Sequence, residues 1–306
     1  MSVMDALNRR AALSFEVFPP KTDAGMEALC GSGGALSRLY TLHPDSISCT
    51  YSAGGADAGK NLAILDAVRS AGNCTPVTHF TCAGNTGESA RQQLRSYLDH
   101  GICHILALRG DLTNHRTDSD FSSACELVDF IRREFGSAFT IAVAGAPEDL
   151  PGSRPLETEI ELLKRKQDSG ADYITTRLCW DMDAFRYWLD AIRASGIWLP
   201  VEAGVMPVLD QAETVSEILS RGSTIPKSLC QILAKNWILP SPFVKDPFDA
   251  DAERKKLDFQ KAGIEYTVTQ IHGYRSCGAD GIHLLTRNRY EDAALIVRES
   301  GLMESR

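Results

Sequence analysis

Residues 105–111 read Ile-Leu-Ala-Leu-Arg-Gly-Asp, and the fold prediction starts from this stretch. Its four apolar residues are typical of the end of a fully buried strand, and Gly110 ends that strand just before the acid Asp111. Glu16 and His79 likewise stand in apolar stretches that read as strands. Because α/β folds place their chemistry at the carboxyl ends of parallel strands, we expect Glu16, His79 and Asp111 to share one pocket.

Outward from this stretch, strand patterns alternate with helical patterns at intervals of roughly 25 to 40 residues, as repeated βα units require. The predicted strands cover residues 13–18, 46–51, the segment around 79, 104–108, 139–144, 173–179, 201–208 and 281–285. Glycines at 31, 33 and 34 are expected to break the first helix. The later helices are predicted at 57–71, 89–99, 122–135, 157–169, 182–194, two short pieces within 212–235, 249 to about 272, and from 286 onward.

Eight such units without a break in composition predict a (β/α)8 TIM barrel, with residues 1–306 as a single catalytic domain. A doubly wound open sheet is the alternative, but eight nearly regular units favour a closed barrel. Active sites of this fold lie at the carboxyl ends of the strands.

Bulk composition narrows the class of protein. The 43% hydrophobic content suffices for one large core, and the net charge of −8 disfavours a nucleic-acid partner. No apolar run is long enough for membrane insertion, and the first ten residues lack a signal-peptide core. The nine cysteines contain no Cys-x-x-Cys pair, which argues against a disulfide framework and against a metal site. We therefore expect a cytoplasmic enzyme that forms a homo-oligomer.

Several charged residues can be explained by a structural role as well as by a functional one. Glu16 taken alone is as compatible with a structural ion pair as with catalysis. The basic run at residues 164–166 is typical of a solvated helix face. Arg177 falls inside the predicted strand 173–179, where a buried charge needs an anionic partner, such as Glu16, Asp111 or an acidic ligand group. Alternatively, Arg177 points outward to a surface acid, since side chains alternate along a strand.

The chain resembles the methylenetetrahydrofolate reductase family in seven segments that run in family order over nearly its whole length: 14–20, 50–51, 79–82, 107–111, 163–171, 204–208 and 288–289. The resemblance implies a (β/α)8 barrel that binds FAD without a covalent bond. It also implies reduction of 5,10-methylenetetrahydrofolate to 5-methyltetrahydrofolate, a step of one-carbon metabolism and methionine biosynthesis. The reaction is a ping-pong hydride transfer in which NADH or NADPH first reduces the flavin.

The resemblance also assigns roles to individual residues. Glu16 corresponds to the general acid, because the methylene bridge opens to an iminium ion only when the departing nitrogen is protonated. Its apolar neighbours favour a raised pKa. Asp111 corresponds to an acid near the flavin ring and the pterin. The other implied cofactor contacts are Thr50, Tyr51, Ala53, His79, Arg109, Gly110 and Glu159, with Arg165 and Lys166 at the FAD phosphates; the implied substrate contacts are Arg177, Gln211 and Arg289.

Four positions depart from the family pattern. Ala146, Leu150, Arg177 and Gln211 stand where a tyrosine, a histidine, a glutamine and an aromatic residue are expected. These changes alter the substrate face and predict weak use of NADH and NADPH. One alternative is the same folate chemistry with electrons taken from a partner protein. Another is a non-catalytic folate- or flavin-binding subunit, against which the retention of Glu16 and Asp111 argues.

Overall fold

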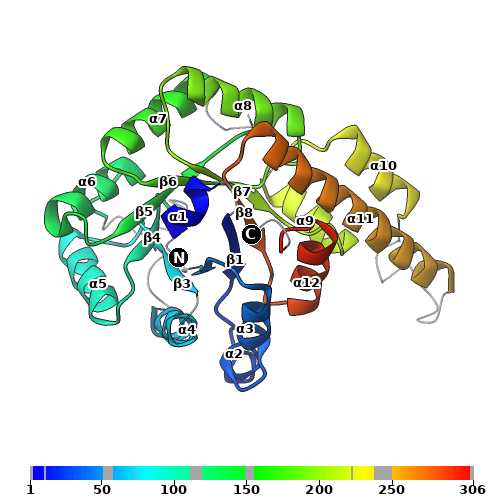
Figure 1. The fold of residues 1–306 in the computed structure, drawn as a ribbon, viewed down its shortest axis with the longest axis horizontal. Helices are drawn as coiled ribbons and strands as arrows, with labels where there is room; N and C mark the ends of the chain where they lie inside the picture. The colour runs from blue at the N-terminus through cyan, green and yellow to red at the C-terminus, as the bar shows by residue number, and fades with distance from the viewer. Residues whose placement is uncertain are drawn as a thin grey trace.

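The computed structural model describes residues 3–9, 12–50, 58–72, 74–110, 119–148, 155–221, 223–237 and 250–303. Within this part of the chain, eight parallel strands follow one another around a closed barrel, with helices outside (Figure 1). The strands are β1 (Ala12–Val17), β2 (Ser46–Cys49), β3 (Thr75–Thr81), β4 (His104–Leu108), β5 (Thr140–Gly145), β6 (Tyr173–Thr176), β7 (Val201–Val205) and β8 (Gly281–Leu285). Because β8 pairs with both β7 and β1, the predicted barrel is confirmed and the open sheet is excluded.

Three strands are shorter than the sequence predicted: β2 ends at Cys49, β6 at Thr176 and β7 at Val205. The pairing of β6 with β7 is brief, since it joins only Ile174 to Val201 and Thr175 to Glu202. The prediction that Arg177 lies inside the sixth strand is therefore wrong, because Arg177 follows the end of that strand.

The helices follow the predicted order, with one addition at the start of the chain. They are α1 (Val3–Asn8), α2 (Asp23–Cys30), α3 (Ala35–Leu39), the 3₁₀ turn η1 (Tyr40–Leu42), α4 (Ala58–Ser70), α5 (Gly87–Asp99), α6 (Ala124–Phe135), α7 (Leu156–Asp168), α8 (Met182–Ala194), α9 (Gln211–Arg221), α10 (Lys227–Lys235), α11 (Ala250–Cys277) and α12 (Tyr290–Glu299). The predicted break at the glycines after residue 30 is confirmed, since it separates α2 from α3. None of the helices described has both the length and the apolar character needed to cross a bilayer.

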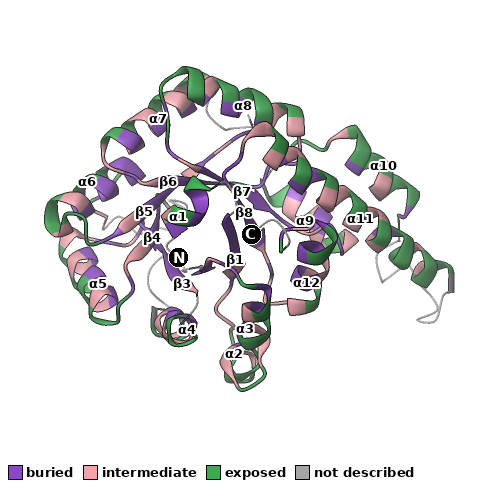
Figure 2. Ribbon diagram, viewed as in Figure 1, coloured by how far each residue is buried: buried purple, intermediate pink, exposed green. Residues whose placement is uncertain are grey.

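Alternating side chains divide the barrel into an outer and an inner layer. Phe15, Ile47 and Phe80 point outward and join the main core between strands and helices. Figure 2 shows the consequence: the strands are buried, whereas the helices expose their outer faces.

The inner layer changes from apolar to polar along the barrel axis. At the amino end, α1 covers the opening (Figure 1), and its Val3, Ala6 and Leu7 pack against inward residues that include Leu106 and Tyr173. Further along the axis, the buried polar side chains of the strands include Ser14, His79, Thr175, Glu202 and His283. The polar part of the interior therefore lies where a barrel enzyme places its active site.

Candidate active site

A cavity of about 1020 Å³ opens at the carboxyl end of the barrel. The predicted site residues that line it are Glu16, Thr50, His79, Arg109, Gly110, Glu159, Lys166, Arg177 and Arg289. Arg165 and Gln211 are not among the lining residues. Tyr51, Ala53, Asp111 and the departing position Leu150 lie outside the described residues. The structure thus brings together most of the predicted site, from strands far apart in the sequence.

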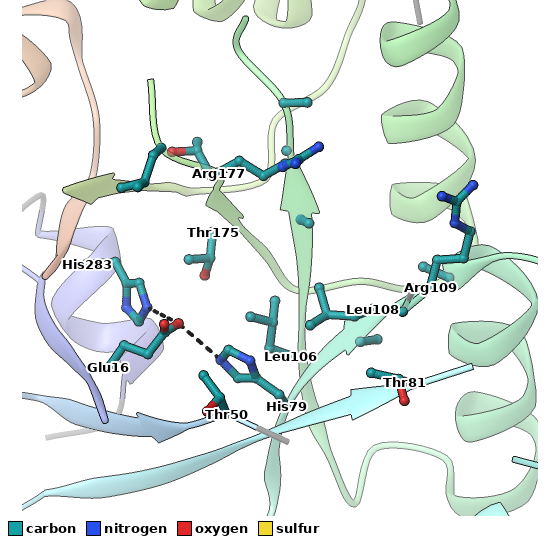
Figure 3. A pocket seen from close by; sticks show the side chains of 18 of the residues that line it. Glu16, Thr50, His79, Thr81, Leu106, Leu108, Arg109, Thr175, Arg177 and His283 are labelled. Carbon is teal, nitrogen blue, oxygen red and sulfur yellow. Dashed lines mark hydrogen bonds and ion pairs between the residues drawn. The ribbon is translucent and has the colours of Figure 1, made fainter. Parts of the chain in front are cut away.

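Glu16 occupies the centre of a buried polar cluster (Figure 3). Its Oε2 lies 3.4 Å from Nε2 of His79 and 3.3 Å from Nε2 of His283. The Glu16 side chain is only 12% exposed. The barrel register explains this meeting, because Glu16, His79 and His283 all take inward positions near the carboxyl ends of β1, β3 and β8.

Their surroundings shift the pKa values of the two histidines in opposite directions. Burial lowers the pKa of His79; the negative charge of Glu16 opposes this in part, and the nearby His283 adds a smaller downward effect. Burial also disfavours charge on His283, but its hydrogen bond to Glu16 and the negative charges of Glu202 and Glu16 outweigh this, so the pKa of His283 is raised. Glu16 therefore lies between one imidazole whose surroundings favour the neutral form and one whose surroundings favour the charged form.

Behind His283 the polar cluster continues away from the cavity. Nδ1 of His283 lies 2.6 Å from the Ser14 hydroxyl and 3.7 Å from Oε2 of Glu202. The Thr175 hydroxyl donates a hydrogen bond of 3.2 Å to that same carboxylate oxygen. Sequence reasoning missed His283 and Glu202, although each stands in a short apolar strand, the same signal that singled out Glu16.

The basic run on α7 divides between cavity and solvent. Lys166 lines the cavity and donates a 2.7 Å hydrogen bond to the carbonyl of Ala144. Lys164 forms a 2.7 Å ion pair with Asp168 on the outside of the helix, and Arg165 is exposed. On the inner face of α7, buried Glu159 accepts a 3.0 Å hydrogen bond from the backbone N–H of Ala146. The helix thus presents one cation and one carboxylate to the cavity side.

Arg177 lies at the cavity wall without being buried. Its backbone N–H donates a 2.8 Å hydrogen bond to the carbonyl of Gly145, and its side chain points away from Glu16 in Figure 3. The expectation that Arg177 is a buried charge is therefore wrong, and Asp111, one of the anionic partners considered for it, lies outside the described residues. The physical reason is that β6 ends one residue earlier, so the guanidinium reaches solvent at the mouth of the cavity.

The loop after β8 forms the opposite rim. Arg287 and Asn288 both adopt left-handed backbone conformations, with φ of 50° and 60°. The Asn288 amide exchanges hydrogen bonds of 2.9 and 2.8 Å with the backbone of Phe18, which fixes the loop to the end of β1. Arg287 pairs with Glu217 at 3.0 Å, and Arg289 pairs with Glu213 and Asp292. Ordered ion pairs with α9 thus surround this side of the cavity.

The cavity fits a large anionic cofactor better than a metal ion. Its volume is at the upper end of the range of about 300–1,000 Å³ that is usual for small-molecule sites. Arg109 and Lys166 supply positive charge along the wall, which suits phosphate groups. Among the described residues, no group of three or more His, Cys, Asp or Glu side chains forms a metal site. These features fit FAD, the cofactor implied by the resemblance.

Comparison with known proteins gives consistent results. The family model described as methylenetetrahydrofolate reductase matches residues 3–301. A Zea mays protein named methylenetetrahydrofolate reductase (NADH) 1 is 30% identical over 96% of this chain and 49% of its own length. The Escherichia coli K12 5,10-methylenetetrahydrofolate reductase is 28% identical over 98% of this chain and 97% of its own. The chain spans about half the length of the yeast and plant relatives that it matches.

Among solved structures, a Clostridium thermocellum protein has the same fold as this chain. Its structure, described as binding two copies of 5-methyl-5,6,7,8-tetrahydrofolic acid, superposes with a TM-score of 0.61. The match covers 99% of both chains at 14% sequence identity. At this identity the likeness supports the barrel fold alone.

Proposed function

The chain belongs to the methylenetetrahydrofolate reductase family, and we propose that it reduces 5,10-methylenetetrahydrofolate to 5-methyltetrahydrofolate with FAD as its cofactor. The near full-length likeness to the Escherichia coli enzyme supports this proposal. The observation that carries it is the position of Glu16, a carboxyl group that faces the cavity from a largely buried cluster with two histidines. We infer that residues 1–306 act as one catalytic domain.

FAD would occupy the wall of the cavity that carries its cations. The chain's own candidates for holding it are Thr50, His79, Arg109, Gly110, Glu159 and Lys166. When bound, FAD supplies the hydride that reduces the one-carbon unit. Contacts from Tyr51, Ala53 and Asp111 remain predictions from the resemblance, as does a phosphate contact from the exposed Arg165.

Glu16 is the proposed general acid. The methylene bridge of the substrate accepts a hydride only after one of its carbon–nitrogen bonds has opened, and the departing nitrogen needs a proton for this. The Glu16 carboxyl group would supply that proton at the cavity face, where few water molecules compete with it. His79 would stay neutral, because burial lowers its pKa, and would orient the same carboxyl oxygen.

The arginines at the rim are proposed to receive the rest of the folate. Arg177 and Arg289 line the cavity and carry permanent positive charge, which suits the carboxylates of a folate tail. Gln211 begins α9, outside the lining, and its substrate contact remains a prediction from the resemblance.

The electron donor is proposed to differ from that of the maize relative, which is named for NADH. Ala146 lines the cavity with a methyl group where an aromatic ring is expected, and Arg177 brings a charge where an amide is expected. The first change removes a ring on which a nicotinamide would stack, and the second places a permanent positive charge at the cavity wall. We therefore infer that NADH and NADPH reduce the flavin weakly. A partner protein is the alternative electron donor.

The first test is a titration of the purified protein with FAD, followed by flavin fluorescence, together with an assay of folate reduction. Lys166→Ala is expected to weaken FAD binding by about tenfold, the size of one lost charge-assisted hydrogen bond. Lys164→Ala is the matched control, since Lys164 belongs to the same basic run but pairs with Asp168 in solvent. A wild-type protein that binds no FAD would refute the proposed cofactor.

A further inference from the structure

The proposed mechanism uses Glu16 but leaves a second buried carboxylate, Glu202, without a role. Glu202 lies on β7 with 2% exposure and is not among the residues that line the cavity. Its Oε2 accepts a hydrogen bond from Thr175 and lies 3.7 Å from the His283 ring. Its Oε1 is buried and meets no hydrogen-bond partner in the part of the chain described. Burying a carboxylate this way is costly, and a compensating interaction is expected.

His283 connects this carboxylate to the proposed acid. One ring nitrogen of His283 faces Glu202 and the Ser14 hydroxyl, while the other contacts Glu16 at 3.3 Å. The imidazole is therefore bracketed by two carboxylates, one at the cavity face and one behind it. Glu16, His283 and Glu202 thus form a row. If both carboxylates in this row are ionised, a single imidazolium leaves it with one excess negative charge.

We propose that Glu202 is a positioning residue whose buried charge, acting through His283, keeps a proton on the Glu16–His283 pair and so keeps Glu16 ready to donate. This inference rests on the proposed function. In each cycle the Glu16 proton passes to the departing nitrogen of the substrate, and the carboxylate left behind faces the His283 imidazolium. The next proton comes from bulk solvent, carried to the Glu16 carboxylate by water that enters the cavity after product release.

The direction of the effect follows from electrostatics. Glu16 and His283 titrate as a pair, and a fixed negative charge beside the pair raises both of its apparent pKa values. The same logic agrees with the raised pKa of His283, to which Glu16 and Glu202 contribute against the effect of burial. The titratable groups that face the row belong to five strands: Glu16 on β1, His79 on β3, Tyr173 on β6, Glu202 on β7 and His283 on β8.

The test removes the charge while keeping the shape. The rate of folate reduction is measured as a function of pH. As the pH rises, this rate is expected to fall at a lower pH in Glu202→Gln than in the wild type. A unit charge at this range shifts a pKa by about one to three units. Glu202→Asp keeps the negative charge, so its rate should fall at the same pH as that of the wild type. Glu148→Gln is the matched control, because Glu148 is also a buried carboxylate but accepts hydrogen bonds from the Trp180 and Asp181 backbone N–H groups and is not among the charges that shift the pKa of His283.

A second readout does not depend on activity. In protein labelled with ¹⁵N-histidine and free of ligand, the His283 ring nitrogens are followed by NMR across pH, and His283→Gln identifies the signals. Glu202→Gln is expected to make His283 lose its proton about one to three pH units lower than in the wild type. If Glu202→Gln does not fold, Glu202→Val removes the same charge with a side chain suited to a strand.

The outcomes separate this inference from the proposed function. An unmoved His283 titration and an unmoved pH dependence of the rate in an active Glu202→Gln enzyme would overturn the inference. A shift of equal size in the pH dependence of the rate in the His283→Gln background would also overturn it, because the effect would then not pass through His283. A wild type that reduces no folate but shows the NMR shift would refute the proposed function and leave the coupling in place.

Discussion

Replacing Glu16 with glutamine is the sharpest test of the proposed chemistry. The amide has nearly the same shape, and its carbonyl oxygen still accepts a hydrogen bond from His283, so the change removes chiefly the transferable proton. Loss of a general acid costs about 10²- to 10⁴-fold in rate. Because the side chain is only 12% exposed, water substitutes poorly for the lost acid. We therefore expect about 10³-fold or more, which corresponds to roughly 4 kcal/mol in the barrier.

The assay separates the two half-reactions. Flavin in the purified enzyme is reduced by dithionite, then mixed rapidly with 5,10-methylenetetrahydrofolate, and its reoxidation is followed by absorbance. Glu16→Gln is expected to slow this step and to leave flavin reduction unaffected. Glu217→Gln serves as the control, because Glu217 lines the same cavity and is 14% exposed but pairs with Arg287. Its expected effect is below about tenfold, as for a partly exposed ion pair.

Two results would refute the reasoning. Reoxidation of Glu16→Gln at the wild-type rate would show that the proton comes from another group. Equal slowing in Glu16→Gln and Glu217→Gln would show that any loss of charge in the cavity has the same effect, with no special role for Glu16.

Three further predictions concern Arg177 at the cavity wall and two positions in the surrounding backbone. NADH and NADPH should reduce the flavin slowly, and Arg177→Gln should speed up one of them; rapid wild-type reduction that is unchanged in the variant would contradict this. Asn288→Ala loses two hydrogen bonds and leaves an alanine at φ 60°, so urea unfolding should show a loss of about 2–4 kcal/mol, with Asn288→Gly about 1 kcal/mol milder. In Gly204→Ala the new Cβ meets the Thr176 carbonyl oxygen at 2.5 Å, which should cost about 1–3 kcal/mol of unfolding free energy. Gly59→Ala, where no described atom lies within 4 Å of the new Cβ, should instead be neutral or slightly stabilising, and equal losses in both variants would contradict the packing argument.

The order of strands and helices was available from the sequence, because buried strands and amphipathic helices impose different periodicities on apolar residues. Strands β4 and β8 and helix α8 begin and end at the predicted residues. The meeting of Glu16 with His79 was also predictable, since both stand near the carboxyl ends of strands that a parallel barrel brings to one edge.

Only the tertiary structure decided which further charges join that cluster and which leave it. The sequence shows Glu202 and His283 as isolated polar residues 81 positions apart in two apolar strands, and their contact depends on the register of β7 against β8. In the same way, Arg177 reaches solvent because β6 ends at Thr176. Lys166 turns inward while Lys164 stays outside, according to how α7 packs on the barrel. Register and helix rotation result from the summed packing of many distant side chains, so no local pattern specifies them.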